Sequence, residues 1–587
     1  MRHRLALPLS IALSVAPFAC GGGGDDPLDA EDSPFPDGKG DGGIDEGSPE
    51  ALAVLALVND RSVDVAELDH DAGLNGTAAK NIIAHRDGAD GDADTTDDDP
   101  FDSLAELDAV KFVGPTALEA LLDHAVDQGL LPGDAAISVI FSPQPKASSH
   151  TARLAQLIGQ AQTSVDIAIY SFSDADISDA LEDAVDRGVK VRFIFETANE
   201  DEDLPETDRD TSSSGRLESR GVDVRFVNKI MHHKFALIDG PRDDAARAGT
   251  ATLVTGSGNW NNSGATSFDE NTFFIEGHAE LNASFQREFD LMWSHSKDFT
   301  AGEDFDFEQS TSDLRSGVAD DPGAAALLTS TNFTVADGST TFRTDKSSTD
   351  VVDEWVKGIE SATESIHIAS GHLRLKPIAE ALIAAHEAHP DLDIQVYLDQ
   401  QEYISASGDA FQAQEVEDCL ADATTDSQRF DCENKEFLWS KQLVDAGIEL
   451  RYKVYSYRWD HSYAVQMHHK YMVIDGDELF SGSYNLSMNA EHGTFENSLH
   501  LAGPSFASII GQFEANFDAI FRTGDGGLDD LRDDIATLDT IPIVFDSIAV
   551  TWQQYTDLRT LFRANCTQID SDEFRQNAAA HKVCERP

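Results

Sequence analysis

The chain has 587 residues, of which 41% are hydrophobic and 25% are charged, and its formal net charge at pH 7 is −65. This hydrophobic content excludes a largely disordered chain, and the length predicts about three or four domains. The acidic balance counts against a protein that binds nucleic acid over a broad surface, because such proteins usually present a basic face to the phosphates.

The first twenty residues have the pattern of a secretory signal peptide. Arg2 and Arg4 precede an apolar run that is too short to span a membrane and that ends at Ala19 and Cys20. This ending resembles a bacterial lipoprotein signal, which implies lipidation of Cys20 and anchoring at the periplasmic or cell-surface side of a membrane; plain secretion is the alternative. Residues 21–48 are rich in Gly, Asp and Pro and are expected to form a flexible acidic linker.

Residues 49–130 are expected to form a small all-helical domain. Two segments, 68–86 and 107–125, each contain a Gly-containing turn before an Ala/Leu-rich helix. They resemble a tandem helix-hairpin-helix unit, a family that often contacts nucleic acid backbones. Asn75 and Lys111 stand where that family usually has glycine, so a structural or protein-docking role is the other interpretation. The acidic stretch between the segments lacks the closing Glu of an EF-hand loop and is expected to be a solvated linker.

The same order of elements then occurs twice, in residues 131–310 and 325–525. The first half has a predicted helix, strand, helix and strand at 150–162, 164–172, 176–188 and 189–196; the second half has them at 351–362, 365–373, 376–389 and 392–399. This alternation predicts an α/β fold with a largely parallel sheet, flanked by helices, in each half. The duplication predicts an active site on the seam between the halves, and residues 526–587 are expected to form a helical tail.

Each half also carries the same set of polar residues. The runs MHHKFALIDG at 231–240 and MHHKYMVIDG at 467–476 each predict a strand that enters a turn, and a Gly-Ser-x-Asn segment and a Glu follow each run. Because side chains alternate along a strand, the first His and the Lys of each run share a face, and two such faces would surround one phosphate. His233 and His469 point the other way and are expected to pack or to support the site.

These residues resemble the phospholipase D superfamily, whose mark is His-x-Lys-x4-Asp-x6-Gly-Ser-x-Asn occurring twice. The second copy fits fully, whereas in the first copy ten additional residues between Asp239 and Gly256 are expected to lengthen a hairpin loop. The likeness covers about residues 137–522. It implies two duplicated α/β/α halves and a displacement at phosphorus that needs no metal or other cofactor and passes through a phosphohistidine.

The resemblance also implies a role for each residue. His232 is expected to be the nucleophile and His468 the general acid and base, although pseudo-symmetry leaves the two interchangeable. The remaining predicted site residues fall into three groups: phosphate ligands (Lys234, Lys470, Ser257, Asn259, Ser483 and Asn485), carboxylates that orient the imidazoles (Glu270 and Glu496), and carboxylates that support the turns (Asp239 and Asp475).

Two features lie beside these motifs. An insertion at about 402–435 contains Cys419 and Cys432, which together with Cys566 and Cys584 in the tail are expected to form two local disulfides, although four cysteines allow three pairings. This insertion is a candidate rim of the active site. The aromatic segment 452–463 predicts either a lining of the substrate channel or ordinary packing in a strand.

Export and anchoring favour a phospholipid as the substrate. The predicted function is therefore hydrolysis of phospholipid headgroup esters to phosphatidic acid by a monomer at a membrane surface. An exported nuclease and a phosphatidyltransferase would use the same chemistry and are the alternatives; nucleic acid is disfavoured by the charge. A binding protein without catalysis is a third interpretation, against which the two intact motif sets count.

Overall fold

The structure is a computed structural model that describes residues 49–59, 63–88, 103–127, 136–300, 321–457, 464–537 and 544–565, with a few single positions between these ranges. The expectations for the signal peptide, for Cys20, for most of the linker and for a Cys566–Cys584 disulfide concern residues outside this description. The chain divides into two compact units, with residues 58–121 in the smaller one and residues 47–57 and 122–587 in the larger one. None of the helices in the described residues is long and apolar enough to cross a membrane.

The smaller unit is helical. The N-terminal helices are α1 (Pro49–Asn59), η1 (Glu67–Asp71), α2 (Gly76–Arg86), α3 (Leu104–Ala109) and α4 (Pro115–Asp127). Asn75, which replaces a glycine of the helix-hairpin-helix pattern, is the N-cap of α2, and its side chain accepts a hydrogen bond from the Thr77 backbone N–H. The resemblance to a helix-hairpin-helix unit stays a prediction.

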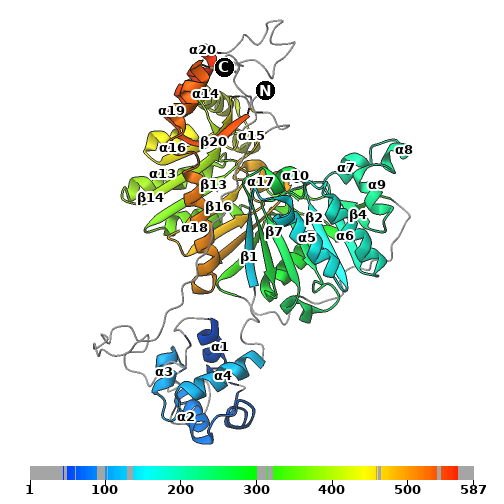
Figure 1. Cartoon of the computed structure of the whole chain (residues 1–587), viewed down its shortest axis with the longest axis vertical. Coiled ribbons are helices and arrows are strands. Elements are labelled where there is room, and N and C mark those ends of the chain that lie inside the picture. The colour runs from blue at the N-terminus through cyan, green and yellow to red at the C-terminus, as the bar shows by residue number, and fades with distance from the viewer. Residues whose placement is uncertain are drawn as a thin grey trace, which may run out of the picture. The chain divides into compact units, whose positions relative to one another are not determined.

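The larger unit contains two eight-stranded sheets (Figure 1). Strands of the first sheet are, in spatial order, β1 (Ala136–Ser142), β8 (Glu270–Glu276), β7 (Thr252–Gly256), β6 (Lys234–Ile238), β2 (Ser164–Ile169), β3 (Lys190–Phe195), β4 (Asp223–Phe226) and β9 (Lys297–Asp298). Those of the second are β10 (Ala324–Leu328), β19 (Asn497–Ala502), β17 (Glu478–Gly482), β16 (Lys470–Ile474), β13 (Ser365–Ser370), β14 (Asp393–Asp399), β15 (Glu449–Ser456) and β20 (Val544–Thr551). The two orders match strand for strand, so the predicted duplicated α/β halves are confirmed.

The sheets are mixed, and the expectation of largely parallel sheets was wrong. β2, β3 and β4 are parallel to one another, as are β13, β14 and β15. The strands from the His-Lys motif to the Glu pair antiparallel in both halves, and in the second half a short hairpin joins β16 to β17. In the first half this hairpin is longer, with the turn η3 (Ala245–Gly249) between β6 and β7, as the ten additional residues predicted.

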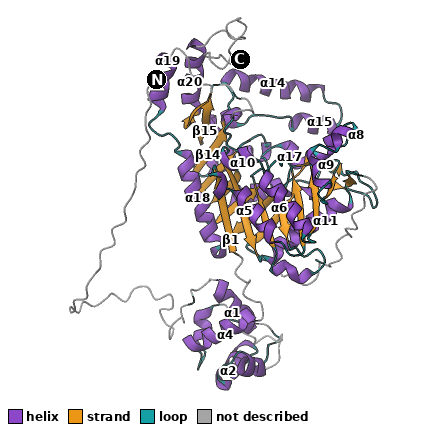
Figure 2. Cartoon of the chain, turned by 45° about the vertical axis from the view of Figure 1, so that its right-hand side comes forward, coloured by secondary structure: helices purple, strands orange, loops and turns teal. Residues whose placement is uncertain are grey.

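Helices cover the sheets on both sides (Figure 2). Those of the first half are α5 (His150–Gln160), α6 (Ala175–Asp186), α7 (Ala198–Asp201), α8 (Glu206–Arg209), α9 (Ser213–Glu218), α10 (Asn262–Thr266) and α11 (Ala279–Ser294). Those of the second half are α12 (Asp350–Ser361), α13 (Lys376–Ala388), α14 (Ala406–Asp422), α15 (Asp426–Glu433), α16 (Ser440–Ala446), α17 (Met488–Gly493), α18 (Ala507–Phe521), α19 (Leu528–Thr537) and α20 (Trp552–Asn565).

Three hydrophobic cores define the layers. One core lies under α5 and α6, and a second lies under α12, α13 and α20. The third is shared, because side chains of α11 and α18, such as Phe289 and Phe513, pack with the inner faces of both sheets through Phe235 and Tyr471. This shared core fixes the two sheets relative to each other, and therefore fixes the seam where both His-Lys strands begin.

The tail predicted as helical also supplies a strand. Between α19 and α20, β20 pairs antiparallel with β15 and completes the second sheet. The aromatic segment before the second motif belongs to the core, since Tyr452, Tyr455 and Tyr457 are buried. For these three residues, ordinary packing is the correct interpretation.

Candidate active site

Two short backbone pairings join the two halves at the seam. β18 (Thr494–Phe495) pairs in parallel with β5 (Ile230–Met231), and Asp269 bridges Met467 in the equivalent place. As a result the N–H of each motif histidine donates across the seam: His232 to the carbonyl of Phe495 at 3.1 Å, and His468 to that of Asp269 at 3.0 Å. The motif glutamates Glu496 and Glu270 directly follow Phe495 and Asp269. Each glutamate therefore lies next to the opposite half.

Each glutamate therefore contacts the histidine of the other half. His232 Nδ1 lies 2.8 Å from Glu496 Oε1, and His468 Nδ1 lies 2.9 Å from Glu270 Oε2. Although the second contact is less well aligned than the first, both leave Nε2 as the nitrogen that faces a substrate. An imidazole held in this way through Nδ1–H can act as a nucleophile or a base at Nε2.

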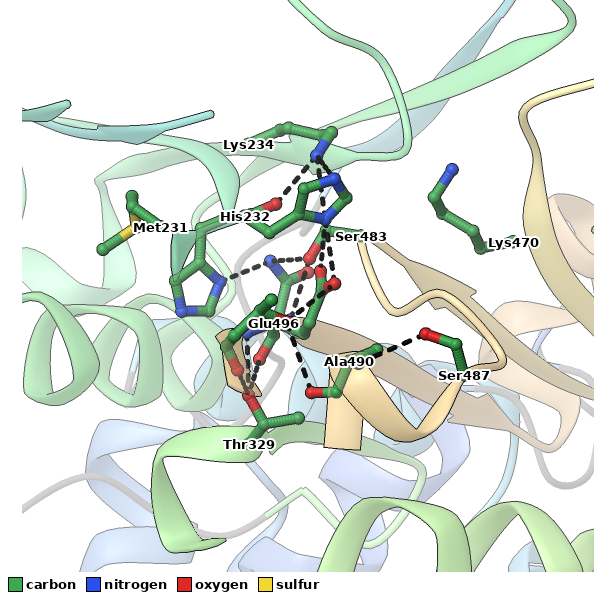
Figure 3. A network of polar contacts seen from close by, with 12 residues as sticks. Met231, His232, Lys234, Thr329, Lys470, Ser483, Ser487, Ala490 and Glu496 are labelled. Carbon is green, nitrogen blue, oxygen red and sulfur yellow. Dashed lines mark hydrogen bonds and ion pairs between the residues drawn. The ribbon is translucent and has the colours of Figure 1, made fainter. Parts of the chain in front are cut away.

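Each motif lysine contacts the motif histidine of its own half. Lys234 Nζ donates to the His232 carbonyl at 2.8 Å, and Lys470 Nζ donates to the His468 carbonyl at 2.7 Å. Lys234 Nζ also lies 3.3 Å from His232 Nε2. Figure 3 shows His232 joined to Glu496 and Lys234, with Lys470 reaching in from the other half. Two buried ammonium groups beside two imidazoles form a site for one phosphate.

Asn259 and Asn485 stand at the start of the loops that leave β7 and β17. Their side-chain Oδ1 atoms are buried and have no hydrogen-bond partner among the described residues. These oxygens can only accept hydrogen bonds, so the predicted role of the two amides in holding phosphoryl oxygens falls to their Nδ2 donors.

Ser257 and Ser483 lie one layer deeper than predicted. Both are fully buried, and each hydroxyl accepts from the backbone N–H of a following strand residue, Asn271 at 2.9 Å and Asn497 at 3.0 Å. Both hydroxyls thus support the strands that follow the glutamates, and their predicted contact with a phosphate stays a prediction.

Asp239 and Asp475 are not brought together with the histidines. Each lies at the opposite end of its strand from the lysine, five residues on and so roughly 16 Å away. Each has positive φ and accepts backbone N–H bonds from the segment before β2 or β13, for example from Thr163 at 2.6 Å and from Glu364 at 2.7 Å. They fix the turn, which fits the supporting role expected for them.

His233 and His469 form a buried second pair across the seam. Asn497 Nδ2 donates to His233 Nδ1 at 3.0 Å, and Asn271 Nδ2 donates to His469 Nδ1 at 3.1 Å. His233 Nε2 also lies 3.0 Å from Glu288 Oε1. Both histidines are fully buried, so they belong to the packing that joins the halves.

Burial controls the electrostatics of the His–Glu pairs. It lowers the pKa of His232 and of His468 well below 6.5, and the nearby lysines lower both further. Burial also raises the pKa of Glu270 and of Glu496 to about 7, against the pull of the lysines. The imidazoles are therefore neutral nucleophiles or bases in the free site.

The lysines respond to the same burial. The pKa of Lys234 falls to about 7 and that of Lys470 to about 8, because desolvation outweighs the attraction of the glutamates. Both lysines therefore lose their proton easily in the empty site. An anion that binds between them stabilises the charged ammonium form and raises both pKa values again.

Two residues near this site, Tyr170 and His372, were not predicted from the sequence. The ring of Tyr170 lies 4.6 Å from that of His232, centre to centre. His372 acts electrostatically on both motif histidines, and its Nδ1 lies 3.0 Å from Glu402 Oε1. Tyr170 and His372 lie just beyond the ends of β2 and β13, at the edge of each sheet that carries the motif lysine. This position at the end of a strand was the feature of the sequence that could have identified them.

Comparison with known proteins gives the family. The model described as "Cardiolipin synthase, PLD-like domain" matches residues 154–293 and 356–521, which is more than half of the chain. The chain belongs to the phospholipase D superfamily. The phospholipase D-like match covers both motif sets and most strands of both sheets, so the predicted family and fold class are confirmed.

The similar curated proteins are all called mitochondrial cardiolipin hydrolase. That of Chlamydomonas reinhardtii is 32% identical over 155 residues, 25% of this chain and 61% of the relative; that of Danio rerio is 34% identical over 152 residues, 24% of this chain and 57% of the relative. The human protein is 28% identical over 151 residues, 25% of this chain and 53% of the relative. The chain thus spans about three fifths or less of these relatives.

Solved structures give weaker matches. The phospholipase D family member Nuc from Salmonella typhimurium is 25% identical with a TM-score of 0.22, covering 28% of this chain and 97% of Nuc. Phosphatidylserine synthase from Haemophilus influenzae is 12% identical with a TM-score of 0.40, covering 65% of this chain and 85% of the synthase. These scores are too low to support an argument.

Proposed function

We propose that the protein is a metal-independent phospholipase D that hydrolyses phospholipid headgroup esters to phosphatidic acid at a membrane surface. The observation that carries this proposal is the exchanged pair of His–Glu contacts around two buried lysines. Family membership and relatives whose names specify cardiolipin, a phospholipid, support a lipid diester as the substrate. Export with an anchor at Cys20 is part of the same proposal.

The first step is attack by His232 Nε2 on phosphorus. The bond from phosphorus to the headgroup oxygen breaks, and that oxygen takes a proton from His468. Substrate binding favours the proton on His468, because the negative phosphodiester counteracts the burial that lowers the pKa of this imidazole. The product of the step is a phosphatidyl group on His232.

The second step regenerates the site. Neutral His468 takes a proton from water, the water oxygen attacks phosphorus, and the phosphorus–nitrogen bond breaks to release phosphatidate. Lys234, Lys470, Asn259 and Asn485 stabilise the charge on the phosphoryl oxygens in both steps. An alcohol in place of water would give transfer instead of hydrolysis.

The test uses protein that begins after Cys20, vesicles of mixed phospholipids, and EDTA. Mass spectrometry follows released headgroups and phosphatidic acid, and added ethanol reports transfer as phosphatidylethanol. His232→Ala and His468→Ala are the blanks, with His389→Ala, an exposed residue after α13, as the matched control. We expect product from the wild type and the control only; absence of lipid product, with cleavage of single-stranded or duplex DNA in EDTA, would replace this proposal by a nuclease.

A further inference from the structure

A cavity of 680 Å³ lies beside the phosphate site in the second half. Asn485 belongs to both, since it is one of the motif amides and also lines the cavity. The wall next to it is α17, which contributes Asn489 and His492, and the opposite wall comes from α15 and the residues that follow it, including Phe430 and Asn434. A phosphodiester held by the motif would therefore extend one of its substituents into this space.

A disulfide braces the α15 wall. Cys419 of α14 is bonded to Cys432 of α15, as predicted from the spacing of the two cysteines, and Phe430 and Asp431 directly precede Cys432. The insertion at 402–435 is therefore a fixed wall of the cavity rather than a loose rim. This bond reduces the ways in which the wall can move when a substrate enters.

The charges in the cavity are already paired. Lys346 Nζ contacts Asp431 Oδ1 at 2.5 Å, and Arg374 contacts both Glu436 and Glu402, the latter at 2.7 Å. These contacts leave little net charge to attract an ionic substituent.

Further polar groups line the cavity and remain for a ligand. Both ring nitrogens of His492 and the Oδ1 atom of Asn485 are buried without a hydrogen-bond partner among the described residues. Glu402 holds Nδ1 of His372, which leaves Nε2 of that ring for the cavity. Asn489 and Ser487 add an amide and a hydroxyl to the lining.

We propose that this cavity is the headgroup subsite and that it selects uncharged, hydroxyl-bearing headgroups such as a polyol or a sugar. Hydroxyls can donate to and accept from the imidazoles and amides that line it. A quaternary ammonium headgroup is disfavoured, because Phe430 is the single Phe, Tyr or Trp ring among the described residues of the lining and cannot form a cage alone. This inference rests on the proposed function and specifies its substrate class.

The experiment compares kcat/KM for vesicles of phosphatidylglycerol, phosphatidylinositol and phosphatidylcholine, with bis(4-nitrophenyl) phosphate as a soluble diester. We expect the wild type to prefer the two polyol lipids over phosphatidylcholine by about tenfold or more, and His492→Ala and Asn489→Leu each to reduce this ratio by about tenfold, the effect of one lost buried hydrogen bond. His389→Ala is the control for an exposed histidine, and circular dichroism checks the fold of each variant.

The outcomes separate the two proposals. Equal turnover of all three lipids, or an unchanged ratio in both folded variants, overturns the headgroup subsite while the lipase stands. Turnover of the soluble diester with none of any lipid overturns the proposed function itself. A preference for phosphatidylcholine also overturns the subsite, because it requires a cationic headgroup to bind there.

Discussion

His232 Nδ1 lies 2.8 Å from Glu496 Oε1, although 264 residues separate the two in the chain. The equivalent contact joins His468 to Glu270, so neither half contains a complete His–Glu pair. The catalytic unit exists only when the shared core holds both sheets together. Substitution of a glutamate in one half is therefore expected to affect the histidine of the other half.

The exchange predicts which histidine each glutamate supports. Glu496→Gln should slow formation of the phosphohistidine, because Glu496 orients the attacking His232, whereas Glu270→Gln should slow proton transfer through His468 in both steps. Each should reduce kcat by about a hundredfold or more, as loss of an orienting carboxylate does in related acid–base pairs. Rapid-quench kinetics separates the two steps; a normal first step in Glu496→Gln, or a normal second step in Glu270→Gln, would contradict the exchange.

The turn aspartates should matter for stability rather than chemistry. Asp475 accepts backbone N–H bonds from Thr363, Glu364 and Ser365, so Asp475→Ala should lower the free energy of unfolding by roughly 1–3 kcal/mol and leave kcat near that of the wild type. Denaturant unfolding measures the loss. Asp477→Ala, on the exposed side of the same turn, is the matched control. A large loss of kcat in a folded Asp475→Ala protein would show a direct role in the site.

The contribution of Asp475 should also depend on pH. Burial alone would raise the pKa of this carboxyl, but the backbone N–H bonds and Thr363 lower it below 3.8 in the folded protein. A depressed folded pKa means that the stabilisation is complete above the unfolded value and is lost as the pH falls through the folded value. The difference in stability between wild type and Asp475→Ala should therefore shrink below about pH 4; a difference that grows there would contradict this account.

Activity should peak in a narrow range near neutral pH. Glu496 orients His232 as a carboxylate, which requires a pH above its raised pKa of about 7, and Lys234 holds the phosphate as an ammonium, which requires a pH below its lowered pKa of about 7. A profile of kcat/KM should therefore be bell-shaped. The alkaline limb of kcat should lie at higher pH than that of kcat/KM, because a bound phosphate stabilises the charged lysine. The reverse order of the two limbs would show that deprotonation of Lys234 is not the cause of the alkaline limb.

The motif residues show how far the sequence reached. The two His-Lys runs and the Gly-Ser-x-Asn segments identified the histidines, lysines and asparagines that meet at the seam, because local spacing along a strand decides which side chains share a face. The contact of Glu270 and Glu496 with the histidine of the opposite half could not be predicted from the sequence. It depends on pairing of Phe495 with Met231 across the seam, which no local pattern encodes.

The serines and the cavity illustrate the same limit. A Gly-Ser-x-Asn segment predicted hydroxyls at the phosphate, but both hydroxyls are buried and accept hydrogen bonds from backbone N–H groups of the strand that follows. His372 and His492 come from different elements and line one cavity together with residues of the disulfide-braced insertion. Tertiary packing rather than residue spacing defines that subsite.

The most direct test of the account is to trap the covalent intermediate. His468→Ala is mixed with phospholipid vesicles in EDTA and quenched at alkaline pH, and the digest is searched by mass spectrometry for a phosphatidyl adduct, with His232→Ala as the blank. We predict an adduct on the peptide that contains His232, since attack still occurs to some extent while breakdown lacks its base. An adduct on His468 in the His232→Ala protein, with none on His232, would reverse the roles; lipid turnover by wild type with no adduct in either variant would contradict the phosphohistidine mechanism.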